Sequence, residues 1–295
     1  MTTQKSFLAG VMLMPERGTP EADFACALFA VLERNADLGI TTDRESGLTV
    51  LFGQDEYQLD AAVGGLRDLC AFEIAAGAPH AVLRETLGHA VAVRHVHKQV
   101  RPPEFAVVSF IFEPGLQDSG FVFEDATAPD TLPAEFTAAA RRGIAAQSVT
   151  GPFAGFALTD FKARLVDGKY HEIDTTPRVF EIAARAALRD GRVRDATVMM
   201  HPQMRLDVVT PEDFIGGVIG DLNSRGVSYN VSTELNGRIR IEGTAPLTNL
   251  FFYRRTLDSM SQTRAKCRIA FDRYVPVESA SPPPRFPPAA AMRVA

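Results

Sequence analysis

Two stretches of the chain, one near each end, show the same order of hydrophobic patterns. The first stretch begins with an almost continuous apolar run at residues 6–14, which predicts a strand. Phe24, Leu28 and Val31 then recur at helical spacing. Further predicted elements up to residue 79 are strands at 40–44, 47–53 and 71–76 and a helix at 56–69. The order βαββαβ is typical of a ferredoxin-like domain.

The first helix has sequence signals at both ends. Thr19 fits the N-cap, because its hydroxyl oxygen can accept a hydrogen bond from a free backbone N–H, and Pro20 fits the first helical position. Gly39 fits a C-terminal stop. We therefore expect this helix to lie between Thr19 and Gly39.

The second stretch begins after residue 196 and repeats the βαββαβ order without an obvious sequence repeat. Its predicted elements are strands at 197–209, 228–234, 238–246 and 266–272 and helices at 211–224 and 248–260.

The middle of the chain has a different pattern. Residues 84–115 alternate along two strands that are joined by a basic connection, broken by proline, at 98–103. An Ala-rich helix is predicted at 133–148, and another starts at Thr175 or Thr176, with Pro177 at its first position and Gly191 as its stop. Strands are predicted at 121–125 and in the segment after residue 151. The expected organisation is an α+β protein with ferredoxin-like domains at 1–80 and 197–277, a different middle domain at 81–196, and a disordered or extended Pro- and Ala-rich tail at 278–295.

The composition is that of an ordinary globular protein, with 46% apolar and 23% charged residues, and it excludes a wholly disordered chain. The net charge of −5 is unevenly distributed. Residues 1–93 contain 6 Lys and Arg against 13 Asp and Glu, a net charge of −7, and residues 94–295 have a net charge of +2. An anionic partner is therefore expected to contact the C-terminal two thirds.

The cysteines and the N-terminus indicate a soluble cytoplasmic protein. Cys26, Cys70 and Cys267 are far apart and form no CxxC pair, which argues against a disulfide framework or a zinc ribbon. The N-terminal apolar run is too short for a signal peptide or a membrane span. His95 and His97 alternate on one strand face, but a metal site needs further ligands, so exposed or stacking histidines are favoured. No cofactor and no membrane contact is expected.

Four collinear segments carry a family resemblance over about residues 6–277. They are GAPHAVLRETL at 77–87, SGFVFED and LPAEFTAAARRGI within 119–144, GPFAGFALTDFKARLVDGKYHEIDTTPRVF at 151–180, and TPEDFIGGVIGDLNSRG at 210–226, followed by the SMSQTR segment within 245–277. In this order and spacing they resemble the third, fourth and fifth domains of the translation elongation factor G family. The resemblance implies two ferredoxin-like domains that flank a middle domain with a left-handed βαβ crossover, an exception to the usual hand.

The phosphate-binding motif G-x-x-x-x-G-K-[ST] is missing from the sequence. The GTPase domain and the second domain of the family would lie N-terminal to residue 1, and the start at Met1 favours a genuine absence. We therefore expect a chain that does not hydrolyse GTP and is not an enzyme.

The resemblance also implies a binding site for RNA. In this family the fourth domain is an arm whose tip enters the decoding region of the small ribosomal subunit and contacts tRNA and mRNA. By resemblance, His171 is the tip histidine, supported by Tyr170, Glu172 and Asp174, while Lys169 supplies positive charge. A histidine can stack on a base or ribose and donate to a phosphate.

The second tip loop is expected between the first two strands of the middle domain. Family members have a long, Gly-rich basic loop there, whereas this chain has the shorter HKQVRPPEFA, stiffened by two prolines. Lys98, Gln99 and Arg101 remain suitable phosphate donors. A purely structural alternative stays open for the DGKYHEID segment, in which Asp174 or Thr175 only caps the following helix.

Basic residues of the last domain are the second candidate RNA contact. Arg225, Arg254, Arg255, Arg264 and Lys266 could approach rRNA of the large subunit, as this domain does in the family.

Further positions depart from the family pattern. Asp258 stands where the family favours a basic residue and Thr263 where it favours glycine, and Asp258 would repel phosphate. The second helix of the first domain opens with QDEYQL, Gln54 to Leu59, in place of a Gly-Glu-Leu-His motif.

The expected function is a non-catalytic, GTPase-less relative of elongation factor G that binds ribosomes, with rRNA, tRNA and mRNA as partners. One alternative is a protein-interaction module whose acidic first domain pairs with a separate GTP-binding subunit. Another is a paralogue that has drifted to a non-translational role. Ribosome protection factors share the arm architecture, but the match is closer to the elongation factor.

Overall fold

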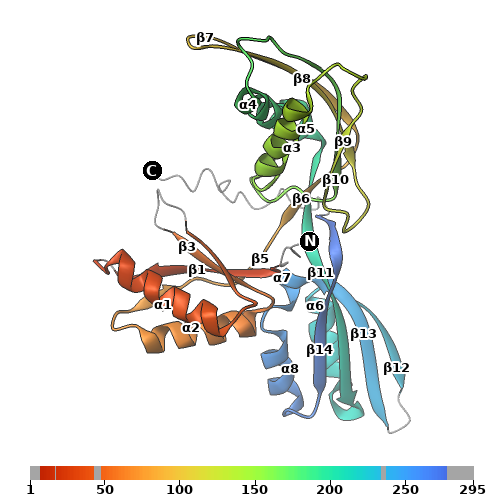
Figure 1. Cartoon of the computed structure of the whole chain (residues 1–295). Coiled ribbons are helices and arrows are strands. Elements are labelled where there is room, and N and C mark those ends of the chain that lie inside the picture. The colour runs from red at the N-terminus through yellow and green to blue at the C-terminus, as the bar shows by residue number, and fades with distance from the viewer. Residues whose placement is uncertain (1–6, 17, 43–47, 234–236, 278–295) are drawn as a thin grey trace. The chain divides into compact units, whose positions relative to one another are not determined.

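The computed structural model describes residues 7–16, 18–42, 48–233 and 237–277, and these residues form three sheets with helices on one face of each. The chain divides into two compact units, which we describe separately (Figure 1). Unit 1 combines residues 1–82 with 201–275, and unit 2 combines residues 83–200 with 276–295. Residues 43–44 and 47 of two predicted strands, and the predicted tail, lie outside the described residues.

The first sheet of unit 1 has the strand order β2-β3-β1-β4, and its pairings are antiparallel. This is the order of a ferredoxin-like domain, so the prediction of that topology is confirmed. A short strand that the pattern did not reveal, β5, also pairs with β1. The elements are β1 (Ala9–Pro15), α1 (Glu21–Arg34), β2 (Gly39–Thr42), β3 (Thr49–Gly53), α2 (Glu56–Leu69), β4 (Ile74–Ala76) and β5 (His80–Ala81).

The ends of α1 differ from the prediction. The N-cap is Pro20, which cannot cap with a side chain, and the hydroxyl of Thr19 instead donates to the carbonyl of Glu16 at 2.8 Å. The helix ends at the C-cap Asn35, and Gly39 opens β2. Both predicted end signals were therefore wrong, because loop and strand contacts use these residues instead.

The second sheet of unit 1 has the order β12-β13-β11-β14, which again is ferredoxin-like. The helix predicted at 248–260 is broken in two, because Phe252 adopts a left-handed φ of 60°. The helix predicted at 211–224 starts with one 3-10 turn. The elements are β11 (Thr197–Pro211), η1 (Glu212–Phe214), α6 (Ile215–Ser224), β12 (Ser228–Thr233), β13 (Arg238–Pro246), α7 (Leu247–Leu250), α8 (Tyr253–Ser261) and β14 (Lys266–Pro276).

The sheet of unit 2 has the order β7-β8-β10-β9. β9 and β10 are parallel neighbours with α3 between them in sequence, which makes a βαβ unit, and the hand of this crossover stays a prediction. Gly191, predicted as the stop of α4, begins the short helix α5. The elements are β6 (Arg84–Leu87), β7 (Val91–Val100), β8 (Pro103–Pro114), β9 (Phe121–Asp125), α3 (Ala134–Ser148), β10 (Phe161–Lys169), α4 (Pro177–Leu188) and α5 (Gly191–Ala196).

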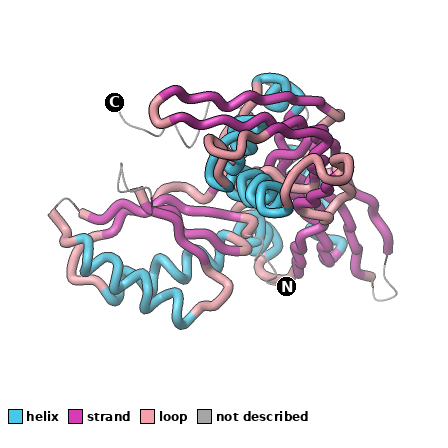
Figure 2. Tube along the Cα trace, turned by 45° about the horizontal axis from the view of Figure 1, so that its top comes forward, coloured by secondary structure: helices cyan, strands magenta, loops and turns pink. Residues whose placement is uncertain are grey.

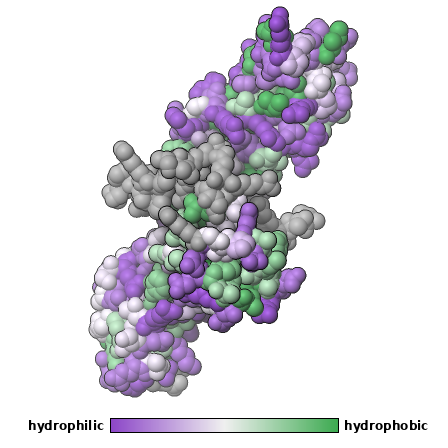
Figure 3. Space-filling model, turned by 90° about the vertical axis from the view of Figure 1, so that its left-hand side faces the viewer, coloured by the Kyte–Doolittle hydropathy of each residue, from purple (hydrophilic) through white to green (hydrophobic). Residues whose placement is uncertain are grey.

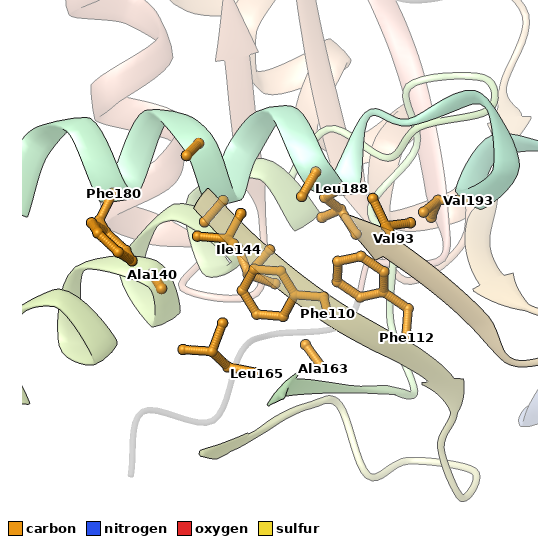
Figure 4. Packing of buried hydrophobic residues seen from close by; sticks show 14 of the residues in the cluster. Val93, Phe110, Phe112, Ala140, Ile144, Ala163, Leu165, Phe180, Leu188 and Val193 are labelled. Carbon is orange, nitrogen blue, oxygen red and sulfur yellow. The ribbon is translucent and has the colours of Figure 1, made fainter. Parts of the chain in front are cut away.

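The core of unit 2 lies between this sheet and the helices α3 and α4 (Figure 4). Phe110 and Phe112 of β8 point into it, and the rings of Phe136 and Phe180 stack with centroids 4.9 Å apart. The two helices cross closely at Gly143, which has room for no side chain. Phenylalanine thus fills much of this core, and the packing holds the helices rigidly against the sheet.

A buried carboxylate organises the loop at residues 151–157. Glu85 of β6 is fully buried, and its carboxylate accepts hydrogen bonds from the backbone N–H groups of Phe153, Ala154 and Phe156 at 2.7 to 3.1 Å. The first of the two strands predicted within 84–115 is divided in the structure into β6, which pairs with the start of β11, and β7. A buried acceptor with three N–H donors is expected to fix the path of this loop.

Candidate nucleic-acid interface

The β7–β8 hairpin extends past the end of its sheet (Figure 2). The last residue of β10, Lys169, pairs with Val107 of β8. The hairpin continues for four more residue pairs, from His97 with Ala106 to Val100 with Pro103. Four residues of strand span about 13 Å, so the hairpin reaches past the end of β10 by roughly that length.

The hairpin end exposes the three side chains that were predicted as phosphate donors. Lys98, Gln99 and Arg101 are all exposed, and the Gln99 side-chain amide donates to the carbonyl of Arg101 at 2.9 Å. Below them, His97 Nε2 lies 2.9 Å from a carboxylate oxygen of Glu104 on the opposite strand. His97 is therefore half-buried and paired, which differs from the expected exposed or stacking histidine.

The second loop begins where β10 ends. Tyr170 packs its ring against Phe136 of α3, with centroids 5.3 Å apart, although it is 41% exposed. The side chain of His171 is 57% exposed, and its Nδ1 lies 3.4 Å both from a carboxylate oxygen of Asp174 and from the backbone N–H of Ile173. No described residue hydrogen bonds to Nε2, so this nitrogen is available to a ligand.

Buried Thr175 ties this loop to the hairpin. Its hydroxyl donates to the carbonyl of Phe105 at 2.5 Å and accepts from the backbone N–H of His171 at 2.7 Å. The backbone N–H of Phe105 in turn donates to the carbonyl of Asp174 at 3.0 Å. The structure thus brings the two predicted tip loops together, and Thr176, the next residue, caps α4. We call residues 98–104 and 169–175 the tip.

Replacing Thr175 by valine should loosen the tip. The substitution keeps the shape of the side chain but removes both hydroxyl hydrogen bonds, so we expect a loss of about 1–3 kcal/mol in the free energy of unfolding. Hydrogen exchange of the His171 amide should become faster, while that of Phe110 in the core should not change. Unchanged exchange at His171 would show that the hydroxyl does not hold the loop.

Two exposed apolar side chains at the tip were missed in the sequence. Val100 is 78% exposed and Ile173 is 83% exposed. Because each lies in a short polar segment, hydrophobicity alone gave no reason to select them. Together with Tyr170 they give the tip apolar as well as cationic contacts, a combination that suits bases and phosphates.

Arg225 lies at an internal site of the last sheet domain. Its guanidinium donates to Asp221 at 2.8 Å, to the carbonyl of Asn249 at 2.9 Å and to the hydroxyl of Thr256 at 3.2 Å, and it lies over the ring of Tyr253. Four of its five N–H groups are engaged, since Nη1 also donates to the carbonyl of Phe251. This placement favours a structural role for Arg225.

The other basic residues of this domain do not form a single patch. Arg254 and Arg255 face α2 of the first sheet domain, where both lie over the ring of Tyr57 and Arg255 pairs with Asp60 at 2.8 Å. Elsewhere, Arg264 lies over the ring of Phe214, and Lys266 is exposed at the start of β14.

The described residues lack two further features. They contain no group of three or more His, Cys, Asp or Glu side chains placed to hold a metal ion. No helix in these ranges has both the length and the hydrophobicity that a membrane crossing requires.

Comparison with known proteins gives consistent matches. The sequence profile of elongation factor G domain IV matches residues 79–194, and that of the elongation factor G C-terminus matches residues 198–283. Elongation factor G of Dinoroseobacter shibae is 35% identical over 269 residues, and that of Jannaschia sp. is 34% identical over the same length. Both alignments cover 90% of this chain and 38% of the relative, so the chain spans less than half the length of these proteins.

A solved structure shows the same architecture over nearly the whole chain. A crystal structure of a protein from Thermus thermophilus matches with a TM-score of 0.70 and 26% sequence identity. The match covers 96% of this chain and 41% of that protein. The expected α+β fold class is thereby confirmed.

Proposed function

Because the chain belongs to the elongation factor G family, with the domains of that protein's C-terminal half, we propose that it binds ribosomal RNA through its tip as a non-catalytic, cytoplasmic translation factor or modulator. The observation that carries the proposal is the hydrogen bonding of Thr175 to Phe105, which supports both loops at one end of unit 2. A site held in place before binding loses little conformational entropy when it binds.

The chemistry of the tip supports RNA as the ligand. Lys98, Arg101 and Lys169 offer positive charges in reach of phosphates, and His171 offers a free ring edge. Tyr170 and Ile173 add apolar contact area for unstacked bases. We propose Gln99, Glu172 and Asp174 as supporting residues and assign Lys266 and Arg264 to a weaker second contact.

Removing the positive charges of the tip should weaken binding to ribosomes. The variant Lys98→Gln/Arg101→Gln/Lys169→Gln should lose about tenfold or more in affinity, and the salt dependence of binding should become less steep. Co-sedimentation with ribosomes at two salt concentrations measures both. The matched control Arg189→Gln/Arg192→Gln/Arg194→Gln removes three exposed charges at the other end of α4 and should bind like the wild type. Equal binding of both variants would refute the proposed contact.

A second candidate function has one observation in its favour. The acidic first domain exposes Phe29 of α1 to 62%, and a large apolar side chain in a charged surface is typical of protein interfaces. The domain could pair with a separate GTP-binding subunit. Affinity capture with wild type and Phe29→Ser tests this, and the capture of a GTPase that does not depend on Phe29 would count against this surface.

A further inference from the structure

Strand β9 lies at the edge of the sheet of unit 2 and has unpaired main-chain groups. Its ladder to β10 uses alternate residues, since the carbonyl of Gly120 accepts from Phe161 and the N–H of Ala126 donates to Leu165. In a parallel pair of strands, the N–H and C=O groups of every second residue point toward the partner strand, and those of the residues between them point away from it. No described residue pairs with these outward groups, which belong to Phe121, Phe123 and Asp125.

An open groove of about 530 Å³ runs beside this edge, between β9 and α3. Phe123 and Asp125 form one side. The other side is formed by α3 and is low, because small residues recur along it. It also carries two arginines. Its lining residues are Ala134, Thr137, Ala138, Arg141, Arg142 and Ala145. A groove between an edge strand and a helix leaves room for the side chains of an added strand.

The groove carries a net positive charge, since Arg141 and Arg142 outnumber the single lining carboxylate, that of Asp125. Arg141 and Arg142 are both exposed, and the nearest carboxylate to Arg142 is Glu181 at 4.0 Å. The carboxylate of Asp125 is already bonded to the backbone N–H and the hydroxyl of Thr127, at 3.0 and 2.7 Å. The face of the chain drawn in Figure 3 carries hydrophilic residues together with apolar patches. The groove itself is lined by charged, polar and small apolar side chains, so charge has to select the occupant as much as hydrophobicity does.

We propose that the β9 edge and its groove bind an extended, acidic peptide segment of a partner protein by strand addition. The outward main-chain groups of β9 pair with the peptide backbone. Small side chains of the peptide fit over Ala134 and Ala138, and its carboxylates meet Arg141 and Arg142. None of these residues belongs to the tip, so the inference stands apart from the proposed ribosome contact.

The test is NMR titration of the full chain with the peptide acetyl-Glu-Val-Glu-Val-Glu-amide, at up to about 1 mM, the range of weak contacts. We expect saturable shifts at the amides of Phe121, Phe123 and Asp125. A peptide of the same sequence with alternate N-methylated amides keeps the charges but cannot pair as a strand, and it should not bind. A Lys-Val peptide should bind at least about fivefold more weakly.

Two substitutions on the exposed side of α3 sharpen the test. Ala138→Leu fills the groove, and Arg141→Glu reverses the charge at position 141. Each substitution should weaken binding of the Glu-Val peptide about tenfold. Arg189→Glu, an equal change of charge outside the groove, should leave the affinity unchanged. Absence of saturable shifts would overturn the proposal, as would equal binding of the N-methylated peptide. Protection of the same amides by a concentration-dependent dimer would also overturn it, in favour of self-pairing.

Discussion

Replacing Glu85 by alanine should lower the free energy of unfolding by about 3–5 kcal/mol, because three buried N–H groups lose their acceptor. These donors belong to Phe153, Ala154 and Phe156, and the residue whose carboxylate they share is fully buried. Chemical denaturation followed by far-UV circular dichroism measures the effect, since the chain has no tryptophan.

The matched control for this substitution is Glu113→Ala. Glu113 lies in the sheet of the same unit but is partly exposed, and it makes one weak pair with Arg164 at 3.5 Å. Its removal should cost less than about 1 kcal/mol. An equally small cost for Glu85→Ala would show that the 151–157 loop holds its path without the carboxylate.

The pH dependence of stability gives a second readout of Glu85. Burial raises the pKa of this carboxyl above its ordinary 4.5, more than the backbone N–H groups lower it. The folded protein therefore keeps the proton to higher pH than the unfolded chain, so this contribution to stability is full below pH 4.5 and is lost as the pH rises through the folded pKa. Wild type should lose stability relative to Glu85→Gln across that window, and parallel pH profiles would contradict the raised pKa.

Substituting Gly143 by alanine should destabilise unit 2 by about 3 kcal/mol, because α3 and α4 would have to move apart. A Cβ at this position would collide with the carbonyl oxygen of Glu181 and would lie 3.1 Å from the side chain of Ala184. Thermal unfolding followed by circular dichroism measures the loss.

Gly64 in α2 is the control for this helix contact. A Cβ there meets no atom within 4 Å, so Gly64→Ala should stabilise the protein by about 0.5–1 kcal/mol through helix propensity. Destabilisation of similar size at both positions would contradict the close crossing of α3 and α4 as the cause.

The hydrophobic pattern predicts most of the fold because long elements bury one regular face. Residues 56–69 and 121–125 were predicted with the bounds that α2 and β9 have, and the ferredoxin-like order follows from such elements. The short strand β5 was missed, since two residues show no periodicity, and β6 was predicted only as the start of the strand that continues as β7. Phe252 breaks the last predicted helix, and its backbone N–H donates to the carboxylate of Glu56, a tertiary contact that no local pattern reveals.

The candidate site could be predicted only in part. The resemblance selected the charged residues of the tip, and the structure places them in two loops that hydrogen bond through Thr175. That link joins residues about 70 positions apart in sequence, so no local pattern reveals it. The internal bonding of Arg225 and the pairing of Arg255 with Asp60 are likewise tertiary contacts. From the sequence, charge alone made all of these arginines equal candidates for RNA contact.

The most direct test is a cryo-electron microscopy structure of the chain bound to ribosomes. We expect residues 98–104 and 169–175 in the decoding region of the small subunit, with Lys98, Arg101 and Lys169 near phosphates and His171 against a nucleotide. A complex in which another surface contacts the ribosome while the tip faces solvent would contradict the central claim.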